Sequence, residues 1–145
     1  MKILVINGPN LNLLGQRDKS HYGSFTLEDI ENKIKNYFSN HNFEFFQSNV
    51  EGEIINQIQN APAYFDGLII NPGGYAHTSV AIRDALEICK IPKIEVHLSN
   101  LSQRDTIRHT LITAPSCNGY ISGFKDEGYL AAVFLIERLV DLKIS

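Results

Sequence analysis

The chain is predicted to adopt an α/β fold, a three-layer sandwich in which a parallel β-sheet lies between two layers of helices. Two observations favour it: short apolar runs with the lengths of buried strands, and helical patterns between those runs. Strands that alternate with helices need crossover connections, so the sheet should be parallel and covered on both faces. With 145 residues, of which 43% are hydrophobic, the chain can form one core, and we predict a single domain over residues 1–145.

The expected elements follow one another along the chain. The strands cover residues 3–6, 43–46, 68–70, 94–98 and, with a weaker pattern, 119–122. The first helix has the clearest start, because Thr26 can cap it and Asp29 occupies the capping-box position. Further helical patterns cover residues 53–59, 79–89 and 129–142. In such folds ligands bind beyond the carboxyl ends of the strands, so functional residues should directly follow the strands.

Composition argues against several classes of function. A formal net charge of -3 gives no basic field of the kind that nucleic-acid binders use. Cys89 and Cys117 form no CxxC pair and have no zinc-ligand spacing, so we expect two reduced thiols and no metal site. No segment has the length of a signal-peptide core or a membrane span, and a cytoplasmic location is expected. His21, His41 and His109 have polar neighbours and are predicted to lie on the surface.

The loop after the first strand is rich in amide and guanidinium groups. It begins NGPNLNLLG at residue 7 and continues to Arg17 and Tyr22. Neither a GxGxxG nor a GxxxxGK[ST] pattern is present, and leucines stand where a nucleotide loop needs small residues. One alternative is a long surface loop without function. The other is a ligand-binding loop that uses Asn10, Arg17 and Tyr22.

Polar residues also follow the third strand. Asn71 can offer both a donor and an acceptor to a ligand, and Gly73 and Gly74 allow close approach of the backbone. His77 follows them, and the next helical pattern contains Asp84. The segment is either an ordinary turn before a capped helix or part of a binding site.

The fourth strand carries the sharpest local signal. Glu95, His97 and Ser99 alternate and should therefore project from one face, whereas a buried parallel strand is normally apolar on both. A carboxylate beside an imidazole fixes its tautomer and favours its charged form, which suits a general acid. The alternative is a buried pair without chemistry. Arg104 and Arg108 are four residues apart and would share a helical face, where they could bind a carboxylate or hydroxyl groups or merely be solvated.

Four segments, GPNLNLLGQR, HYGS, NPGGYAHTSVAIRDAL and IEVHLSN, occur in this order before the two arginines. Together they resemble the type II 3-dehydroquinate dehydratases over nearly the whole chain. The resemblance implies a flavodoxin-like fold with a five-stranded parallel sheet. It also implies a lyase that dehydrates 3-dehydroquinate to 3-dehydroshikimate in the shikimate pathway, which leads to chorismate and the aromatic amino acids. No cofactor is implied, and the expected assembly is a homododecamer, a tetramer of trimers.

The same resemblance assigns roles to residues. Tyr22 matches the base that removes the C2 proton, Arg17 the cation that favours its phenolate, and Asn10 a group that holds the enolate through water. His97, oriented by Glu95, matches the acid that protonates the departing C1 hydroxyl. The substrate-binding positions match Asn71, His77, Leu98 through its backbone, Ser99 and Arg108, together with Asp84 contributed by a neighbouring subunit. The chain departs from the usual pattern at Asp18-Lys19, where relatives more often have Glu-Pro.

Two other classes of function fit the same predicted scaffold. A flavin- or phosphate-binding module would need a small-residue phosphate loop after the first strand, and this loop contains Pro9 and three leucines instead. A receiver-like signalling domain would need acidic residues after the first strand and an Asp at the end of the third. Those places hold Asn7 and Asn71. A non-catalytic homologue of the dehydratases is separated from an enzyme only by a turnover assay.

Overall fold

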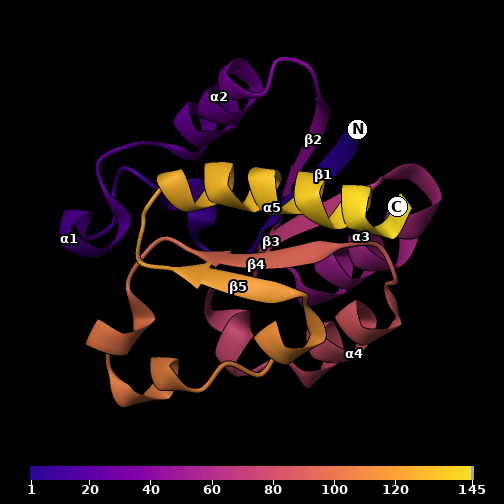
Figure 1. Ribbon diagram of the computed structural model, residues 1–145. Helices are drawn as coiled ribbons and strands as arrows, with labels where there is room; N and C mark the ends of the chain where they lie inside the picture. The colour runs from indigo at the N-terminus through magenta and orange to yellow at the C-terminus, as the bar shows by residue number, and fades with distance from the viewer. Residues whose placement is uncertain (145) are drawn as a thin grey trace.

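The computed structural model describes residues 1–144 and has the predicted α/β architecture, with a five-stranded parallel sheet (Figure 1). The strand order is β2-β1-β3-β4-β5. The chain adds β2 on one side of β1 and then β3 on the other side, so the strand order reverses between β1 and β3. The strands are β1 (Lys2–Asn7), β2 (Asn42–Gln47), β3 (Gly67–Asn71), β4 (Lys93–His97) and β5 (Gly119–Ser122).

Helices cover both faces of the sheet (Figure 1). The two on one face are α2 (Leu27–Tyr37) and α5 (Glu127–Ile144), and the two on the other are α3 (Glu51–Tyr64) and α4 (Val80–Ile88). The predicted capping box of α2 is confirmed, since Asp29 N donates to Thr26 Oγ1 at 3.2 Å and Thr26 N donates to Asp29 Oδ2 at 2.9 Å. The pattern over residues 53–59 understated α3, which continues to Tyr64 with Pro62 in its last turn.

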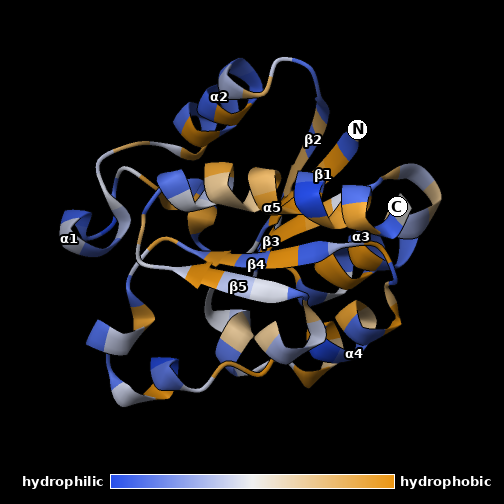
Figure 2. Cartoon of the chain, viewed as in Figure 1, coloured by the Kyte–Doolittle hydropathy of each residue, from blue (hydrophilic) through white to orange (hydrophobic). Residues whose placement is uncertain are grey.

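The side chains of the central strands alternate between two apolar clusters, one on each face of the sheet. Figure 2 shows that these strands are largely hydrophobic. Ile3 and Val5 of β1 pack with α2 and α5, whereas Leu4 and Ile6 pack with α3 and α4. On β4, Ile94 and Val96 belong to the first cluster. The polar alternation predicted for β4 is therefore confirmed, because Glu95 and His97 take the opposite face.

Short helical turns connect the larger elements, and all but η5, which precedes β5, follow the carboxyl ends of β1, β3 and β4. They are α1 (Lys19–Tyr22) and the 3₁₀ turns η1 (Leu11–Leu13), η2 (Gly73–His77), η3 (Leu101–Gln103), η4 (Thr106–His109) and η5 (Ala114–Ser116). The expectation that Arg104 and Arg108 share a helical face was wrong. Arg104 follows η3 with an extended backbone, at φ −93° and ψ −178°, and Arg108 lies in η4. The break comes from Asp105, which is also extended and starts the second turn.

The loops after β1 and β3 pass close to each other. Asn7 and Asn71 are register partners at the ends of the two strands, and Gly8 N donates to Asn71 O at 2.8 Å. A Cβ atom at Gly8 would lie 2.5 Å from the carbonyl oxygen of Pro72. Gly73 has φ +60°, and a Cβ there would lie 3.0 Å from Pro9 O. Only glycine satisfies the contact at Gly8, which explains its position between the strand and the loop.

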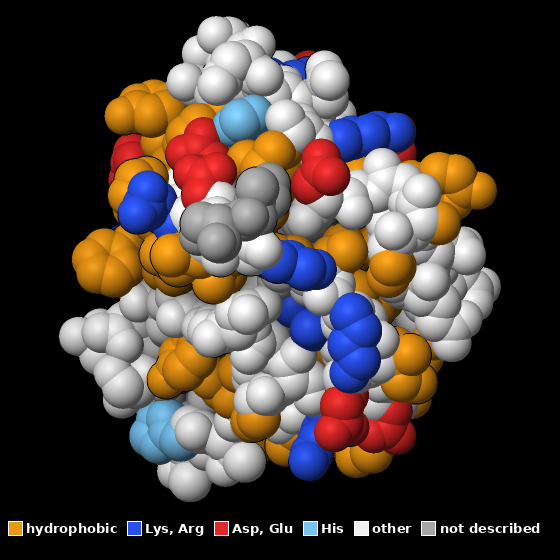
Figure 3. All heavy atoms as spheres, turned by 45° about the vertical axis from the view of Figure 1, so that its right-hand side comes forward, with side chains coloured by type: hydrophobic (Ala, Val, Ile, Leu, Met, Phe, Trp, Pro, Cys, Tyr) orange, Lys and Arg blue, Asp and Glu red, His pale blue; other side chains and the backbone are white. Residues whose placement is uncertain are grey.

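The exposed surface of the protein is mixed in charge on the face that Figure 3 shows. Acidic and basic side chains are interspersed on the face in Figure 3. Within residues 1–144, no helix combines the length and the apolar character that a membrane span requires.

The prediction that His41 is an ordinary surface residue was wrong: its side chain is 9% exposed, and Nε2 lies 2.6 Å from Glu137 Oε1 on α5. This pairing is long-range in sequence, so no local pattern could reveal it.

Candidate active site

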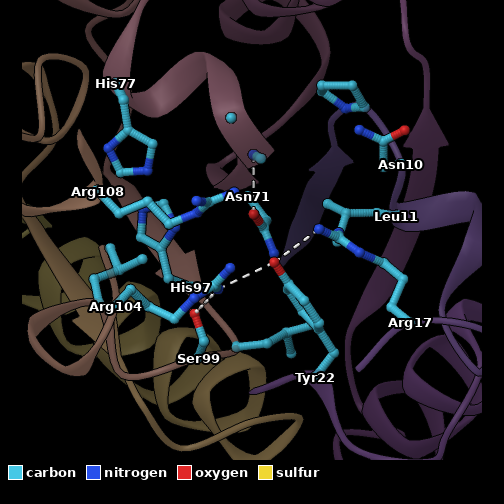
Figure 4. Close-up of a pocket in the computed structure, with 15 residues that line it drawn as sticks. Asn10, Leu11, Arg17, Tyr22, Asn71, His77, His97, Ser99, Arg104 and Arg108 are labelled. Atoms are coloured by element: carbon cyan, nitrogen blue, oxygen red, sulfur yellow. Dashed lines mark hydrogen bonds between the residues drawn. The ribbon is translucent and has the colours of Figure 1, made fainter. Parts of the chain in front are cut away.

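A pocket opens at the carboxyl edge of the sheet, beside the point where the strand order reverses (Figure 4). Its wall combines the loop after β1, the turn after β3, the end of β4 and the segment from η3 to η4. The predicted residues that line it are Asn10, Arg17, Tyr22, Asn71, His77, His97, Leu98, Ser99 and Arg108. The structure thus brings together nine of the eleven predicted site residues, the other two being Glu95 and Asp84.

Two arginines hold the hydroxyl of Tyr22. Arg17 Nη2 donates to Tyr22 Oη at 2.7 Å, and its guanidinium lies over the Tyr22 ring with Cζ 3.7 Å from the centroid. Arg104 Nη1 donates to the same oxygen at 3.1 Å and to Ser99 Oγ at 3.0 Å. Guanidinium groups only donate hydrogen bonds, so both contacts fall on lone pairs of the phenol oxygen. Two permanently charged groups therefore contact this oxygen.

Tyr22 is positioned by the short helix α1. Asp18 is its N-cap, and its carboxylate accepts from Ser20 N at 2.8 Å and from Ser20 Oγ at 2.6 Å. These hydrogen bonds lower the pKa of Asp18 below its usual value. Asp18, where this chain departs from the family pattern, therefore caps the turn. Its last residue, Tyr22, faces the pocket.

A chain of hydrogen bonds leads from His97 into the protein interior. His97 Nε2 lies 2.7 Å from Glu95 Oε2, and Glu95 is fully buried. The other carboxylate oxygen accepts a hydrogen bond from the hydroxyl of Thr113, which is also fully buried. Both carboxylate oxygens thus have partners, and the orientation of Glu95 is fixed. His97 itself faces the pocket, so Glu95 acts behind it rather than at the pocket wall.

His77 is oriented by the backbone. His77 Nδ1 lies 2.9 Å from Thr110 O, and a carbonyl only accepts, so the proton is on Nδ1. The rings of His77 and His97 have centroids 6.2 Å apart. Figure 4 shows both histidines, with Arg104 and Arg108, on one side of the Tyr22 hydroxyl, and Arg17 and Asn10 on the other. A ligand in the pocket would therefore lie between a tyrosine and two imidazoles.

Asp84 and Arg108 differ in their relation to the pocket. Asp84 is exposed on α4 and does not line the pocket of its own chain. Arg108 lines the pocket, but its Nη1 also donates to Asp105 at 2.7 and 2.9 Å. The Asp105 pair therefore orients the Arg108 guanidinium from the solvent side.

Prediction from the sequence missed two residues of the site. Arg104 contacts Tyr22 across 82 residues of sequence, and Thr113 contacts Glu95 across 18. The pairing of Arg104 with Arg108 drew attention to both arginines, but nothing in the spacing linked either one to the tyrosine. Thr113 gave no signal, because a threonine in a loop is common and its partner lies on another element.

Comparison with known proteins gives consistent results. The family model of class II dehydroquinases matches residues 1–137. The 3-dehydroquinate dehydratase of Fusobacterium nucleatum is 53% identical, over 94% of this chain and 97% of its own, and that of Thermotoga petrophila is 49% identical, over 97% and 98%. A solved type II dehydroquinase from Butyrivibrio crossotus superposes with a TM-score of 0.91 at 50% identity, covering 94% of this chain and 97% of the other. Another, from Propionibacterium acnes, has a TM-score of 0.87 at 34% identity, with coverages of 94% and 96%.

Proposed function

The chain belongs to the class II dehydroquinase family, and from this premise we propose that Tyr22 is the base and His97 the acid of its reaction. Membership makes it a type II 3-dehydroquinate dehydratase, a hydro-lyase of the shikimate pathway. The observation that carries the proposed roles is the pair of guanidinium groups on one phenol oxygen, facing a histidine with a buried carboxylate behind it.

In the proposed reaction, Tyr22 phenolate removes a proton from C2, beside the C3 ketone. The electron pair of the C–H bond moves into an enolate. The enolate then re-forms the ketone as the C1–O bond breaks, and His97 gives a proton to the departing hydroxyl, which leaves as water. The products are 3-dehydroshikimate, water, a neutral Tyr22 and a neutral His97. A proton transfer from Tyr22 to His97 restores the starting state.

The base needs cations around its oxygen, because an ordinary phenol is protonated near neutral pH. Arg17 at 2.7 Å and Arg104 at 3.1 Å supply two permanent positive charges. The contact of Arg104 with Ser99 also ties the base to the end of β4, close to His97. Arg104 is therefore proposed to act on the base, Tyr22, together with Arg17.

The acid, in contrast, needs a negative charge beside it, and Glu95 supplies one. Buried Glu95 favours the charged form of His97 and fixes which ring nitrogen faces inward. Thr113 donates to the second oxygen of Glu95 and so holds the carboxylate in place behind the imidazole. His97 can then present a proton to the departing hydroxyl.

The remaining pocket residues fit a polyhydroxylated carboxylic acid. The amide of Asn71, the hydroxyl of Ser99, the ring of His77 and the guanidinium of Arg108 are assigned to the substrate, with the backbone of Leu98. Asn10 is assigned to the enolate, through a water molecule. Its backbone is in the left-handed region, at φ 69°, where asparagine is favoured among residues with a side chain.

The proposal includes an assembly. Asp84 is exposed on α4, so it can serve a site only in a neighbouring subunit, and a homododecamer of four trimers would bring it there. Sedimentation with simultaneous assay tests this idea: a fully active monomer would reject the shared site. A cytoplasmic location is also proposed, consistent with the free thiols of Cys89 and Cys117.

The decisive experiment for the function is turnover of 3-dehydroquinate. The conjugated enone of 3-dehydroshikimate absorbs in the ultraviolet, so its appearance can be followed directly. His97→Asn should lower kcat far more than it changes KM, because a leaving-group acid acts in the transition state. An unchanged kcat in that variant would assign the acid to another group.

A further inference from the structure

A buried polar network lies directly beneath the pocket, and the mechanism above uses only one of its members, Asn71. It joins the ends of β1 and β3 to the first turn of α5 through Asn7, Asn71 and Tyr129. Their side chains are 1%, 3% and 0% exposed. Tyr129 Oη donates to Asn7 Oδ1 at 2.5 Å, and Asn71 Nδ2 donates to Tyr129 Oη at 3.1 Å. Of the three, only Asn71 lines the pocket.

The direction of every bond in this network follows from one backbone group. Gly73 N–H can only donate, and it lies 3.1 Å from Asn71 Oδ1, so the carbonyl end of the Asn71 amide must face it. The amino end then faces Tyr129 and donates to its oxygen. The single hydroxyl proton of Tyr129 must therefore go to Asn7, which offers its carbonyl oxygen. Reversing the Asn71 amide would set its amino group against the Gly73 N–H, and reversing the Asn7 amide would take away the acceptor of the Tyr129 proton.

We propose that Tyr129 is a positioning residue for the dehydratase reaction, which holds the Asn71 amide with its carbonyl at the Gly73 N–H and its amino group at Tyr129, so that one N–H remains as a donor for the substrate. The Asn71 carbonyl is taken by Gly73 and one N–H by Tyr129, so the second N–H is what remains for a ligand. The substrate group that Asn71 recognises through this N–H is an acceptor, such as a hydroxyl oxygen or a carboxylate oxygen. This inference rests on the proposed function and adds the polarity of one substrate contact.

Burial supports the arrangement. Desolvation raises the pKa of Tyr129, so its hydroxyl keeps its proton and remains a donor over the working pH range. The network also accounts for Asn7, which is a buried polar residue at the end of a central strand, where an apolar residue would be expected. The network holds the Asn71 amide at both ends, and a loss at one end leaves it free to turn about the other.

A double-mutant cycle between Tyr129 and Asn71 tests the proposal. Tyr129→Phe removes only the hydroxyl, and we expect kcat/KM to fall about tenfold, mainly through KM, as for one hydrogen bond to substrate. Asn71→Ala removes the donor itself. If Tyr129 acts through Asn71, adding Tyr129→Phe to Asn71→Ala should change kcat/KM less than about twofold. Multiplicative effects of the two substitutions would overturn the proposal, since they would give Tyr129 a separate role.

A second variant, Asn7→Ala, tests the same role of Tyr129 independently of any folding defect in Tyr129→Phe. Asn7→Ala removes the acceptor, so Tyr129 can donate toward Asn71 and the amide can turn. The same rise in KM is expected, with the same loss of effect in the Asn71→Ala background. Wild-type KM in both Asn7→Ala and Tyr129→Phe would reject the role of Tyr129. Tyr64→Phe, at a tyrosine that is 68% exposed, is the matched control and should leave both constants unchanged.

The side-chain amide of Asn71 gives a readout that does not depend on catalysis. In ¹⁵N-labelled protein, its two N–H resonances should shift in Tyr129→Phe, and in Tyr64→Phe they should stay at their wild-type positions. An inactive wild-type protein with this NMR shift would reject the proposed function and leave the positioning intact. An active wild-type protein without the shift would reject the positioning alone.

Discussion

Replacing Glu95 with Gln removes one buried charge and nearly preserves the side-chain shape. The carboxylate is fully buried, with one oxygen 2.7 Å from His97 Nε2 and the other accepting from Thr113. The Thr113 hydroxyl can donate or accept, so it can serve either orientation of the new amide. The geometry can therefore persist while the negative charge that favours the His97 imidazolium is lost.

The expected loss follows from that charge. A hydrogen bond to a charged group contributes about 1.5–3 kcal/mol net. Two unit charges about 4 Å apart attract by about 4 kcal/mol at an effective dielectric constant of about 20. If this stabilisation of the protonated acid is absent when the hydroxyl departs, kcat should fall by about 10- to 1000-fold. Proton exchange at C2 should continue, because it precedes the step that needs His97.

The assay measures kcat and KM from enone absorbance, C2 exchange by NMR and the free energy of unfolding in urea. Glu95→Gln should unfold at a similar or higher urea concentration, because a buried carboxylate carries a desolvation penalty. Glu44→Gln, at a residue with a 58% exposed side chain on β2, is the control and should retain wild-type kinetics. A kcat within twofold of wild type in Glu95→Gln would refute the reasoning, and Glu95 would then be a structural residue.

Four further predictions concern Tyr22, Arg104, Thr113 and Cys117. Tyr22→Phe should abolish elimination and C2 exchange while substrate still binds, since only the proton acceptor is lost; exchange at the wild-type rate would assign the base elsewhere. Arg104→Met should lower kcat by about 10- to 100-fold through loss of one charged hydrogen bond to Tyr22, with a residual rate that rises at alkaline pH, and pH–rate profiles check this. Thr113→Val should lower kcat and Thr113→Ser should restore most of it, because serine keeps the donor to Glu95; equal kinetics in the two variants would contradict this. Burial raises the pKa of the Cys117 thiol from 9.0 to about 12, so iodoacetamide at pH 8 should modify it far more slowly in the folded than in the urea-unfolded chain. The protonated Cys117 thiol should add to the free energy of unfolding below about pH 9, and this contribution should decline as the pH rises toward about 12. Unfolding curves of Cys117→Ser and the wild type at alkaline pH check this.

The parts of the fold that could be predicted are those with local or periodic signals. The capping box at Thr26 and Asp29 lies within four residues, and the alternation of Glu95, His97 and Ser99 needs only the two-residue period of a strand. The parallel sheet with helices on both faces also followed from the alternation of strands with helices, and the resemblance of the motifs implied its five strands. These elements are confirmed, whereas the roles of the site residues stay predictions.

The parts that could not be predicted depend on long-range contacts or on very short elements. Helix α1 has four residues, too few for a periodic pattern, and depends on the Asp18 cap. Arg104 and Thr113 reach their partners only once the chain has folded, and His41 meets Glu137 across 96 residues. The turn between Arg104 and Arg108 was mistaken for a helix because charged residues four apart fit both.

The close approach of Gly8 to Pro72 constrains how this protein can be re-engineered. With 2.5 Å between a hypothetical Cβ and the Pro72 carbonyl oxygen, the two backbones leave no room for independent variation. A loop transplanted from a relative after β1 would need the matching turn after β3, since each is shaped by the other. Libraries that aim at new substrates should therefore exchange residues 8–9 and 72–73 as one cassette, and diversify the rim at Gly74, where an added Cβ would meet no atom within 4 Å.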